Sequence, residues 1–248
     1  MKRFFVIVIL LGNVLFASTI TIAVAANVSY AIKPLIKAFN RLNPETKVNV
    51  ILGSSGKLFA QMTHGAPYTL FMSADMKYPN TLYKNGMTVT KPVIYAQGAL
   101  AMLSQKERNY SAKIEVLTSP DIKKIAIANP KTAPYGAAAV EALQNAKLYT
   151  LLKEKFVYAE SISQTVTYAT TAADIGIVAL SSLYAPQMRQ YKKAKQWLEI
   201  DEHLYTPINQ GMVMLKNAKD NVEVKAFYDF MLSKRAKEIL TSFGYKVQ

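Results

Sequence analysis

The sequence predicts an α/β protein built from two lobes, each a parallel or mixed sheet flanked by helices, with a ligand cleft between them. Short apolar segments alternate with helical patterns along the chain, which is typical of such sheets. The 248 residues, 51% of them hydrophobic, suffice for two lobes. Small polar turns recur at four places where a predicted strand is followed by a helix. Ligands of α/β sheets bind beyond the carboxyl ends of the strands, so we expect these turns to line the cleft.

Residues 1–17 have the composition of a secretory signal peptide. Lys2 and Arg3 come first, an almost uninterrupted apolar run over residues 4–16 follows, and Ala17 ends it. The run is too short for a comfortable transmembrane helix. We expect cleavage after Ala17. Because the chain has no cysteine that could carry a lipid anchor, we expect the mature protein to be free in the periplasm.

The first two polar turns lie in the amino-terminal part of the chain. An apolar strand over residues 19–25 ends near Asn27 and precedes a helix. A second strand, over residues 47–52, leads into Gly-Ser-Ser-Gly at residues 53–56, again before a helix. A Ser-Ser pair on its own commonly caps a helix. The recurrence of such turns favours a pocket in which serine hydroxyls and unpaired helix N–H groups bind an anion.

The other two turns lie in the middle of the chain. A strand over residues 125–128 leads to the turn at Tyr135, and a strand that ends near Tyr158 leads to the turn at Ile162. A helix follows each turn. A further short helix is expected to begin at Ser119, because a Ser-Pro-Asp sequence is typical of a helix start.

The chain is expected to pass twice between the lobes. The extended apolar segment 93–103 takes it into the second lobe, and the strand over residues 207–215 returns it to the first. We therefore predict that residues 18–97 and 208–248 form lobe 1 and that residues 98–207 form lobe 2. Each lobe then supplies two of the four turns to one cleft.

The formal net charge of +14 suggests attraction to anions, nucleic acid or an acidic membrane. The lysines are scattered, however, and dense runs such as residues 191–195 are short and typical of a solvated face. No zinc-finger spacing or RNP aromatic motif accompanies them. We therefore expect no nucleic-acid partner.

The sequence offers no constellation of catalytic residues. His64 and His203 lack a partner at metal-ligand spacing, and there is no cysteine. No Gly-x-Ser-x-Gly elbow surrounds a serine, and Asp75 and Asp174, each beside a strand–helix boundary, are expected to be structural. We expect no catalytic residue, no bound metal ion and no cofactor. An anion-dependent enzyme is the less favoured alternative to a binding protein.

The stretch GSSGKLFAQMTHGAPYTLFMSAD, residues 53–75, resembles the signature of periplasmic molybdate-binding proteins, the receptors of molybdate ABC transporters. Its Ser-Ser turn opens a helix, and Gly-Ala-Pro and Ser-Ala-Asp follow. The resemblance extends more thinly from about Thr19 to the end of the chain. It implies the type II periplasmic-binding-protein fold, a monomer without a cofactor, and a membrane permease with its ATPase as partners. The implied ligand is molybdate, together with tungstate.

The resemblance also implies which residues bind the anion. Asn27 corresponds to a position that is serine in many relatives and asparagine in a subgroup, and it is expected to use its side-chain amide and its backbone N–H. Ser55 is expected to use its hydroxyl and its N–H, and Tyr135 and Ile162 only their N–H groups. The tyrosine that contributes a hydroxyl in some members falls at Ala179. The asparagine subgroup also lacks that tyrosine, so the Asn27 amide is expected to compensate.

Sulfate- or phosphate-class oxoanions remain alternatives to molybdate. Hydrogen phosphate needs an acceptor in the pocket, and Glu160 is the one carboxylate near the predicted turns. Sulfate differs from molybdate mainly in size, which spacing in a sequence does not encode. The choice of molybdate therefore comes from the resemblance, which does not separate molybdate from tungstate.

Overall fold

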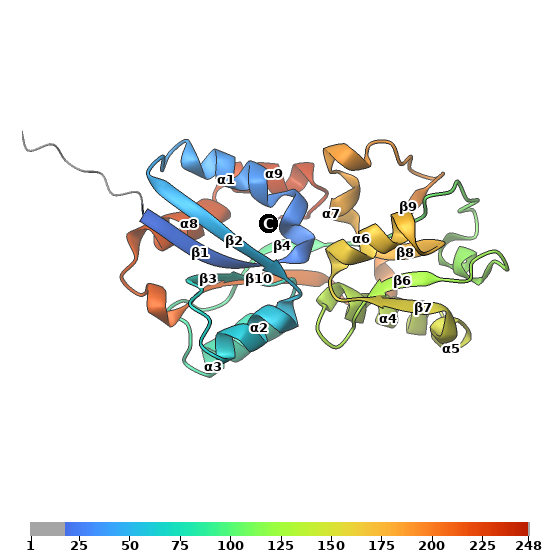
Figure 1. Cartoon of the computed structure of the whole chain (residues 1–248), viewed down its shortest axis with the longest axis horizontal. Helices are drawn as coiled ribbons and strands as arrows, with labels where there is room; N and C mark the ends of the chain where they lie inside the picture. Colours follow the sequence, from blue (N-terminus) through green and yellow to red (C-terminus); the bar gives the residue numbers. More distant parts are fainter. Residues whose placement is uncertain (1–17, 248) are drawn as a thin grey trace, which may run out of the picture.

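The computed structural model of the chain describes residues 18–247 and contains two five-stranded mixed sheets that lie side by side (Figure 1). We call each sheet with its covering helices a lobe. In lobe 1 the strand order is β2-β1-β3-β10-β4, and in lobe 2 it is β7-β6-β8-β5-β9. The predicted fold class is therefore confirmed. The predicted signal peptide lies outside the described residues.

Lobe 1 contains the amino-terminal strands and the returning strand β10. Strand β1 pairs in parallel with β2 and β3, and β10 is antiparallel to β3 and β4. Its strands are β1 (Ser18–Ala25), β2 (Thr46–Gly53), β3 (Leu70–Met72), β4 (Val93–Gly98) and β10 (Ile208–Met214). Its helices are α1 (Ile32–Asn40), α2 (Ser55–Thr63), α3 (Lys77–Lys84), α8 (Val222–Leu232) and α9 (Lys234–Ser242).

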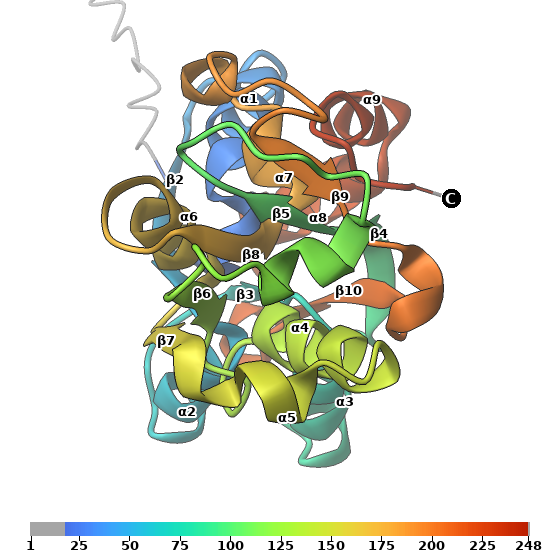
Figure 2. The same cartoon turned by 90° about the vertical axis from the view of Figure 1, so that its right-hand side faces the viewer.

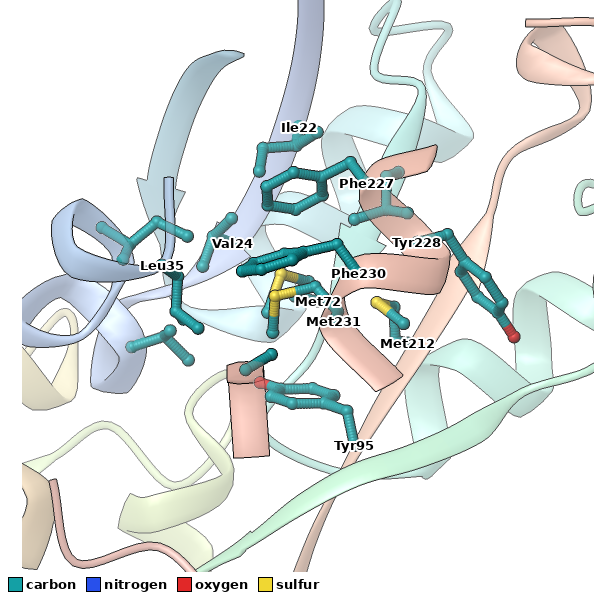
Figure 3. Close-up of a cluster of buried hydrophobic side chains, with 14 of the residues drawn as sticks. Ile22, Val24, Leu35, Met72, Tyr95, Met212, Phe227, Tyr228, Phe230 and Met231 are labelled. Atoms are coloured by element: carbon teal, nitrogen blue, oxygen red, sulfur yellow. The ribbon is translucent and has the colours of Figure 1, made fainter. Parts of the chain in front are cut away.

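Helices cover both faces of the lobe 1 sheet, because successive residues of its buried strands point to opposite faces. Ile22 and Val24 of β1 pack with α1, α8 and α9, whereas Ala23 packs with α2 and α3. Figure 3 shows the first of these cores, in which Phe227 and other residues of α8 lie against β1. Each large side chain buried in this way contributes roughly 1.5–3 kcal/mol to stability.

Lobe 2 also has a five-stranded mixed sheet covered by helices on both faces, but its strands follow one another along the chain in a different order. Strand β6 is parallel to β7 and β8, and β5 is antiparallel to β8 and β9. Its strands are β5 (Leu100–Leu103), β6 (Ile125–Ala128), β7 (Phe156–Ala159), β8 (Ile175–Ala179) and β9 (Trp197–Glu199). Its helices are α4 (Pro134–Asn145), α5 (Tyr149–Leu152), α6 (Ile162–Thr171) and α7 (Leu180–Leu183). Helices α4 and α5 lie on one face of the sheet, and α6 and α7 on the other (Figure 2).

The chain passes between the sheets at two places. The extended segment 93–103 is divided into β4 in lobe 1 and β5 in lobe 2, with Ala99 between them. The segment after β9 leads back to β10 in lobe 1. The predicted lobe ranges, with their divisions at residues 97/98 and 207/208, stay a prediction.

The short helix predicted to begin at Ser119 is absent from the described structure. A 3-10 helix, η2 (Lys113–Thr118), instead ends just before Ser119. The Asp121 carboxylate accepts hydrogen bonds from the Ser119 hydroxyl and the Arg108 guanidinium rather than from the N–H groups of a following helix. The Ser-Pro-Asp sequence thus forms a turn stabilised by an arginine, and no local pattern pointed to Arg108.

Candidate functional site

Four turns, two from each lobe, meet at one small cavity between the sheets. In lobe 1 the 3-10 helix η1 (Ala26–Tyr30) follows β1, and α2 follows β2. In lobe 2, α4 follows β6 and α6 follows β7. The cavity has a volume of about 10 Å³ and is lined by Ala25, Ala26, Asn27, Ser54, Ser55, Ala74, Ala133, Pro134, Tyr135 and Ile162. Drug-sized ligands occupy sites of roughly 300–1,000 Å³, so this cavity suits only an ion or a very small molecule.

The four residues predicted to bind an anion all line this cavity. Their backbone N–H groups have no acceptor among the described residues. Each N–H lies in the first turn of its helix, where no intrahelical acceptor exists. All four residues are at most 5% exposed, and a buried N–H without an acceptor is costly. Four such groups at one cavity favour a ligand with several oxygen acceptors.

Local sequence explains why the two N–H groups of lobe 2 are free. Pro134 occupies the first position of α4 and has no N–H, so Tyr135 carries the first donor of that helix. Ser161 caps α6, and its side chain accepts from the Gln164 N–H at 3.3 Å. Ile162 therefore keeps its N–H for the cavity, while its side chain packs in the core of lobe 2.

The Ser54-Ser55 pair provides two hydroxyls beside the cavity. Ser55 Oγ accepts the Ala74 N–H at 2.9 Å, which leaves its own proton available for donation. Ser54 is the first residue outside α2, but its side chain does not cap the helix, and its buried Oγ has no partner among the described residues. The sequence left open whether Ser54 caps the helix or contributes to an anion pocket, and the resemblance assigned binding to Ser55 alone. Its position in the cavity wall makes it a second hydroxyl donor.

Asn27 differs from the expectation for its side chain. Its Nδ2 donates to Gln210 Oε1 at 2.9 Å and to the Tyr245 hydroxyl at 3.1 Å, so both amide protons are used within the protein. Its Oδ1 has no donor among the described residues. In this arrangement Asn27 offers the cavity its backbone N–H and not its amide protons. Ala179 is buried at the end of β8, is not among the lining residues and supplies no hydroxyl.

Tyr135 also uses its side chain in a way that the sequence did not reveal. Its ring is 1% exposed, and its hydroxyl accepts from Gln210 Nε2 at 2.9 Å. Burial raises the pKa of this hydroxyl well above its usual range, so the group stays protonated. Tyr135 therefore presents its N–H to the cavity while its phenol reaches β10 of the other lobe.

Among the described residues, no charged side chain lines the cavity. An ion pair between Lys57 Nζ and Glu160 Oε1, at 2.5 Å, joins α2 of lobe 1 to lobe 2 outside the cavity. Both side chains are more than half exposed. The Gly56 N–H also donates across the lobes to the Thr132 carbonyl at 2.9 Å. A Cβ on Gly56 would lie 2.6 Å from the Tyr78 hydroxyl and 3.0 Å from Thr132, so only glycine permits this approach.

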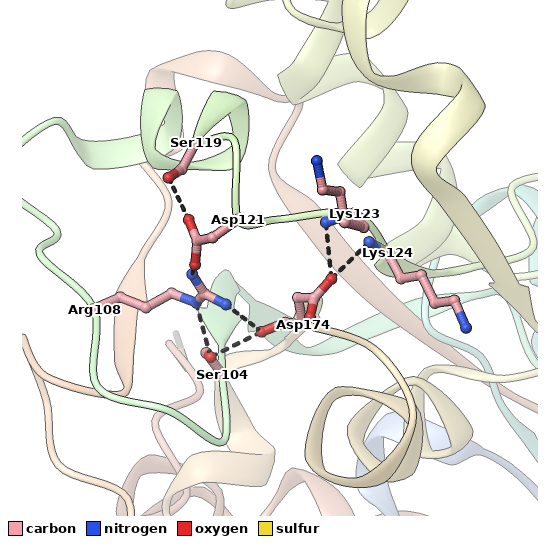
Figure 4. Close-up of polar contacts among 7 residues, drawn as sticks. All are labelled: Ser104, Arg108, Ser119, Asp121, Lys123, Lys124 and Asp174. Carbon is pink, nitrogen blue, oxygen red and sulfur yellow. Dashed lines mark hydrogen bonds and ion pairs between the residues drawn. The ribbon is translucent and has the colours of Figure 1, made fainter.

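The two aspartates expected to be structural have structural partners. Asp75 accepts from the Ser73 hydroxyl at 2.9 Å and the Tyr78 N–H at 3.3 Å, and burial raises its pKa. Asp174 accepts the N–H groups of Lys123 and Lys124, both at 2.8 Å (Figure 4). Burial alone would raise the pKa of Asp174, but the two N–H groups together with the positive charges of Arg108 and Lys106 outweigh it, and the pKa is lowered.

The Arg108 guanidinium lies beside Asp174 and binds three oxygens. It donates to Asp121 Oδ2 at 2.6 Å, to Ser104 Oγ at 2.9 Å and to the Asp174 carbonyl at 3.1 Å (Figure 4). We call Arg108, Asp121 and Asp174 the Arg108 cluster. Its contacts all lie within lobe 2, so it is part of the scaffold and not of the cavity.

Residues 18–247 contain no group of three or more His, Cys, Asp or Glu residues arranged to hold a metal ion. No helix in the same range is long and apolar enough to span a membrane. His64 Nδ1 lies 2.7 Å from the Ala60 carbonyl on an exposed turn, away from the cavity.

The chain has the architecture of a bilobal solute-binding protein that encloses an anion. Two segments join its two sheets, and helix N-termini from both lobes surround an uncharged cavity. A profile described as "Bacterial extracellular solute-binding protein" matches residues 20–246. The molybdate-binding protein ModA of Rhodobacter capsulatus is 35% identical over 92% of this chain and 88% of its own length. The chain belongs to the bacterial extracellular solute-binding protein family, alongside the ModA proteins.

Solved structures support the same placement. The periplasmic molybdate-binding protein of Azotobacter vinelandii superposes with a TM-score of 0.85 at 30% identity, covering 92% of this chain and 99% of that chain. A sulfate-binding protein from Mycobacterium tuberculosis shares the fold, with a TM-score of 0.74 at 15% identity over 93% of this chain and 87% of that one. The family consists of transport receptors rather than enzymes.

Proposed function

We propose that this chain is the periplasmic receptor of a molybdate importer and that it binds molybdate, or tungstate, as a tetrahedral dianion between its lobes. The observation that carries the proposal is the set of four unpaired N–H groups, with the Ser54 and Ser55 hydroxyls, around a cavity without charged side chains. The names of the relatives at 30–35% identity favour molybdate as the anion. The receptor acts as a monomer without a cofactor and delivers its ligand to a membrane permease with an ATPase.

Each ligand residue has a defined part in this proposal. Asn27, Tyr135 and Ile162 donate backbone N–H groups, and Ser55 donates both its N–H and its hydroxyl. A hydrogen bond to a charged acceptor contributes roughly 1.5–3 kcal/mol. Several of them are enough for submicromolar affinity after the cost of association. The Asn27 amide takes part only indirectly, through the groups that it contacts beneath the cavity.

The uncharged cavity wall also favours a fully deprotonated anion over hydrogen phosphate. A protonated phosphate oxygen requires an acceptor, usually a carboxylate. Glu160, the carboxylate nearest to the turns in the sequence, is paired with Lys57 outside the cavity. Molybdate and tungstate carry no proton near neutral pH, and donors alone satisfy them.

Export completes the proposed role. The predicted signal peptide directs the chain to the periplasm, and its predicted removal leaves a chain that begins at Ser18. Mass spectrometry of the exported protein should therefore give an N-terminus near Ser18. An intact Met1 in a soluble extracytoplasmic pool would contradict this part of the proposal.

A thermal-shift panel on the mature protein tests the ligand. At about 100 times its Kd, molybdate or tungstate should add roughly 2.7 kcal/mol to the free energy of unfolding. Sulfate and phosphate at the same concentration should add far less. Equal shifts for all four anions, lost in moderate salt, would indicate attraction by the basic surface and would overturn the proposal.

A further inference from the structure

A buried glutamine lies beneath the cavity and contacts both lobes. Gln210 is on β10 of lobe 1, two residues after the start of that strand, and it is fully buried. A buried amide has no access to water, so every donor and acceptor that lacks a protein partner carries a cost. The hydrogen bonds of Gln210 therefore restrict the positions of the side chains that it contacts.

The partners of Gln210 include two of the ligand residues. Gln210 Oε1 accepts from Asn27 Nδ2 at 2.9 Å, and Gln210 Nε2 donates to the Tyr135 hydroxyl at 2.9 Å. Asn27 belongs to lobe 1 and Tyr135 to lobe 2. One side chain thus joins a ligand segment of each lobe, although it does not line the cavity itself.

The backbone nearby leaves room for this contact. Gly98, at the end of β4, carries no side chain. A Cβ at that position would lie 1.9 Å from the Tyr135 hydroxyl oxygen and 2.7 Å from Gln210 Nε2. Gly98 has a negative φ, so the requirement for glycine is one of space and not of backbone conformation. Any other residue would displace the phenol from Gln210.

A second contact holds Asn27 from the other lobe. Its carbonyl accepts from the Ser181 hydroxyl of lobe 2 at 3.2 Å and from the Tyr245 hydroxyl at 2.9 Å. Asn27 is therefore fixed through both its amide and its carbonyl. The N–H of the same residue remains free for the cavity.

We propose that Gln210 is a positioning residue for anion binding and that it acts through the Tyr135 hydroxyl. It sets the distance between the N–H groups of Asn27 and Tyr135 and stabilises the observed arrangement of the two lobes. This inference rests on the proposed function, because it concerns the same anion site. Since the hydrogen bond joins opposite lobes, its loss is expected to speed the release of the ligand more than to slow its capture.

The test compares two Tyr→Phe substitutions that each remove one buried hydroxyl. Tyr135→Phe breaks the bond to Gln210. Tyr110→Phe is the matched control, because the Tyr110 hydroxyl donates to the Gln196 carbonyl at 2.9 Å entirely within lobe 2. Molybdate affinity is measured by calorimetry and the rate constants by stopped flow. Tyr135→Phe should raise the Kd about tenfold, mainly through koff, and Tyr110→Phe should leave it within about twofold.

Gln210→Met, which keeps the length of the side chain without its polar atoms, identifies the partner through a double-mutant cycle. Tyr135→Phe should cost about tenfold in the wild-type background and nothing measurable in the Gln210→Met background. An equal cost in both backgrounds would overturn the proposal. If Gln210→Met does not fold, equal effects of Tyr135→Phe and Tyr110→Phe would overturn it. A wild-type protein that does not bind molybdate would instead defeat the proposed function.

Discussion

The Arg108 cluster and the interlobe cavity both present hydrogen-bond donors that suit negatively charged groups, but the two sets of donors differ. In the Arg108 cluster the Arg108 guanidinium and the Ser119 hydroxyl hold the Asp121 carboxylate, and two backbone N–H groups hold the Asp174 carboxylate. The cavity offers N–H groups and hydroxyls of the same kinds and no cation. The two regions thus share neutral donors and differ in the arginine.

This difference follows from whether the bound anion is a permanent part of the protein or is released. Asp121 and Asp174 are permanent, so Arg108 is always partnered, although its side chain is only 7% exposed. A transported anion must leave, and a buried lysine or arginine in the cavity would then be without a partner in a poorly solvated place. Oriented N–H groups attract an anion through their dipoles and carry no net charge when it departs.

Asn27→Asp should have the largest effect on binding. The substitution places a carboxylate in the wall of the cavity proposed to bind a dianion. It also puts a carboxylate oxygen against Gln210 Oε1, where the Asn27 amide donates a hydrogen bond. Two unit charges 4 Å apart repel by about 4 kcal/mol at an effective dielectric constant of 20, so we expect molybdate affinity to fall by about a thousandfold or more. Calorimetry measures the loss. Asn49→Asp, on an exposed part of β2, makes the same change of charge and should leave the affinity nearly unchanged.

Ser55→Ala should cost roughly 2–3 kcal/mol of binding free energy, or about 30- to 150-fold in affinity. It removes a hydroxyl donor and also leaves the Ala74 N–H without its acceptor. Ser242→Ala, on the exposed side of α9, is the control and should bind like the wild type. An unchanged Kd for Ser55→Ala would mean that the anion does not contact this turn.

Arg108→Gln should destabilise lobe 2 by roughly 1–3 kcal/mol and leave the molybdate affinity unchanged. Chemical unfolding and calorimetry measure the two effects on one preparation. A large loss of affinity with no loss of stability would place Arg108 in the binding mechanism instead of the scaffold.

The Arg108 cluster also predicts a dependence of stability on pH. Hydrogen bonds from Ser119 and then Arg108 lower the pKa of Asp121 to about 2. Because the folded pKa lies below the unfolded one, the contribution of Asp121 is complete above about pH 4 and is lost as the pH falls through 2. Part of this loss should disappear in Arg108→Gln.

Lys57→Gln should have the smallest effect. The ion pair with Glu160 joins the lobes but is exposed, and such pairs contribute about 0–1 kcal/mol. We expect the affinity for molybdate to change by less than about threefold, as measured by calorimetry. A loss of more than tenfold would mean that Lys57 supplies charge to the anion.

The sequence predicted the parts of the fold and site that depend on local patterns. Strand and helix periodicity placed the four turns, and small residues at Ser55 and at the turn before Tyr135 marked the cavity. It could not predict partners that are distant in the chain. Asn27 contacts Tyr245, 218 positions away, and Tyr135 contacts Gln210, 75 positions away. For this reason the roles of the Asn27 amide and the Tyr135 phenol, and the turn at Ser119, emerged only from the three-dimensional arrangement.

The central claim is that neutral donors from both lobes enclose the anion, and a crystal structure with bound molybdate tests it most directly. The anion should lie in the interlobe cavity, with its oxygens 2.7–3.2 Å from the backbone N–H groups of Asn27, Ser55, Tyr135 and Ile162. No lysine or arginine nitrogen should lie within about 4 Å of it, which is the limiting distance of an ion pair. Molybdate held by Lys57 or by any other basic side chain, in the cavity or on the surface, would contradict the account.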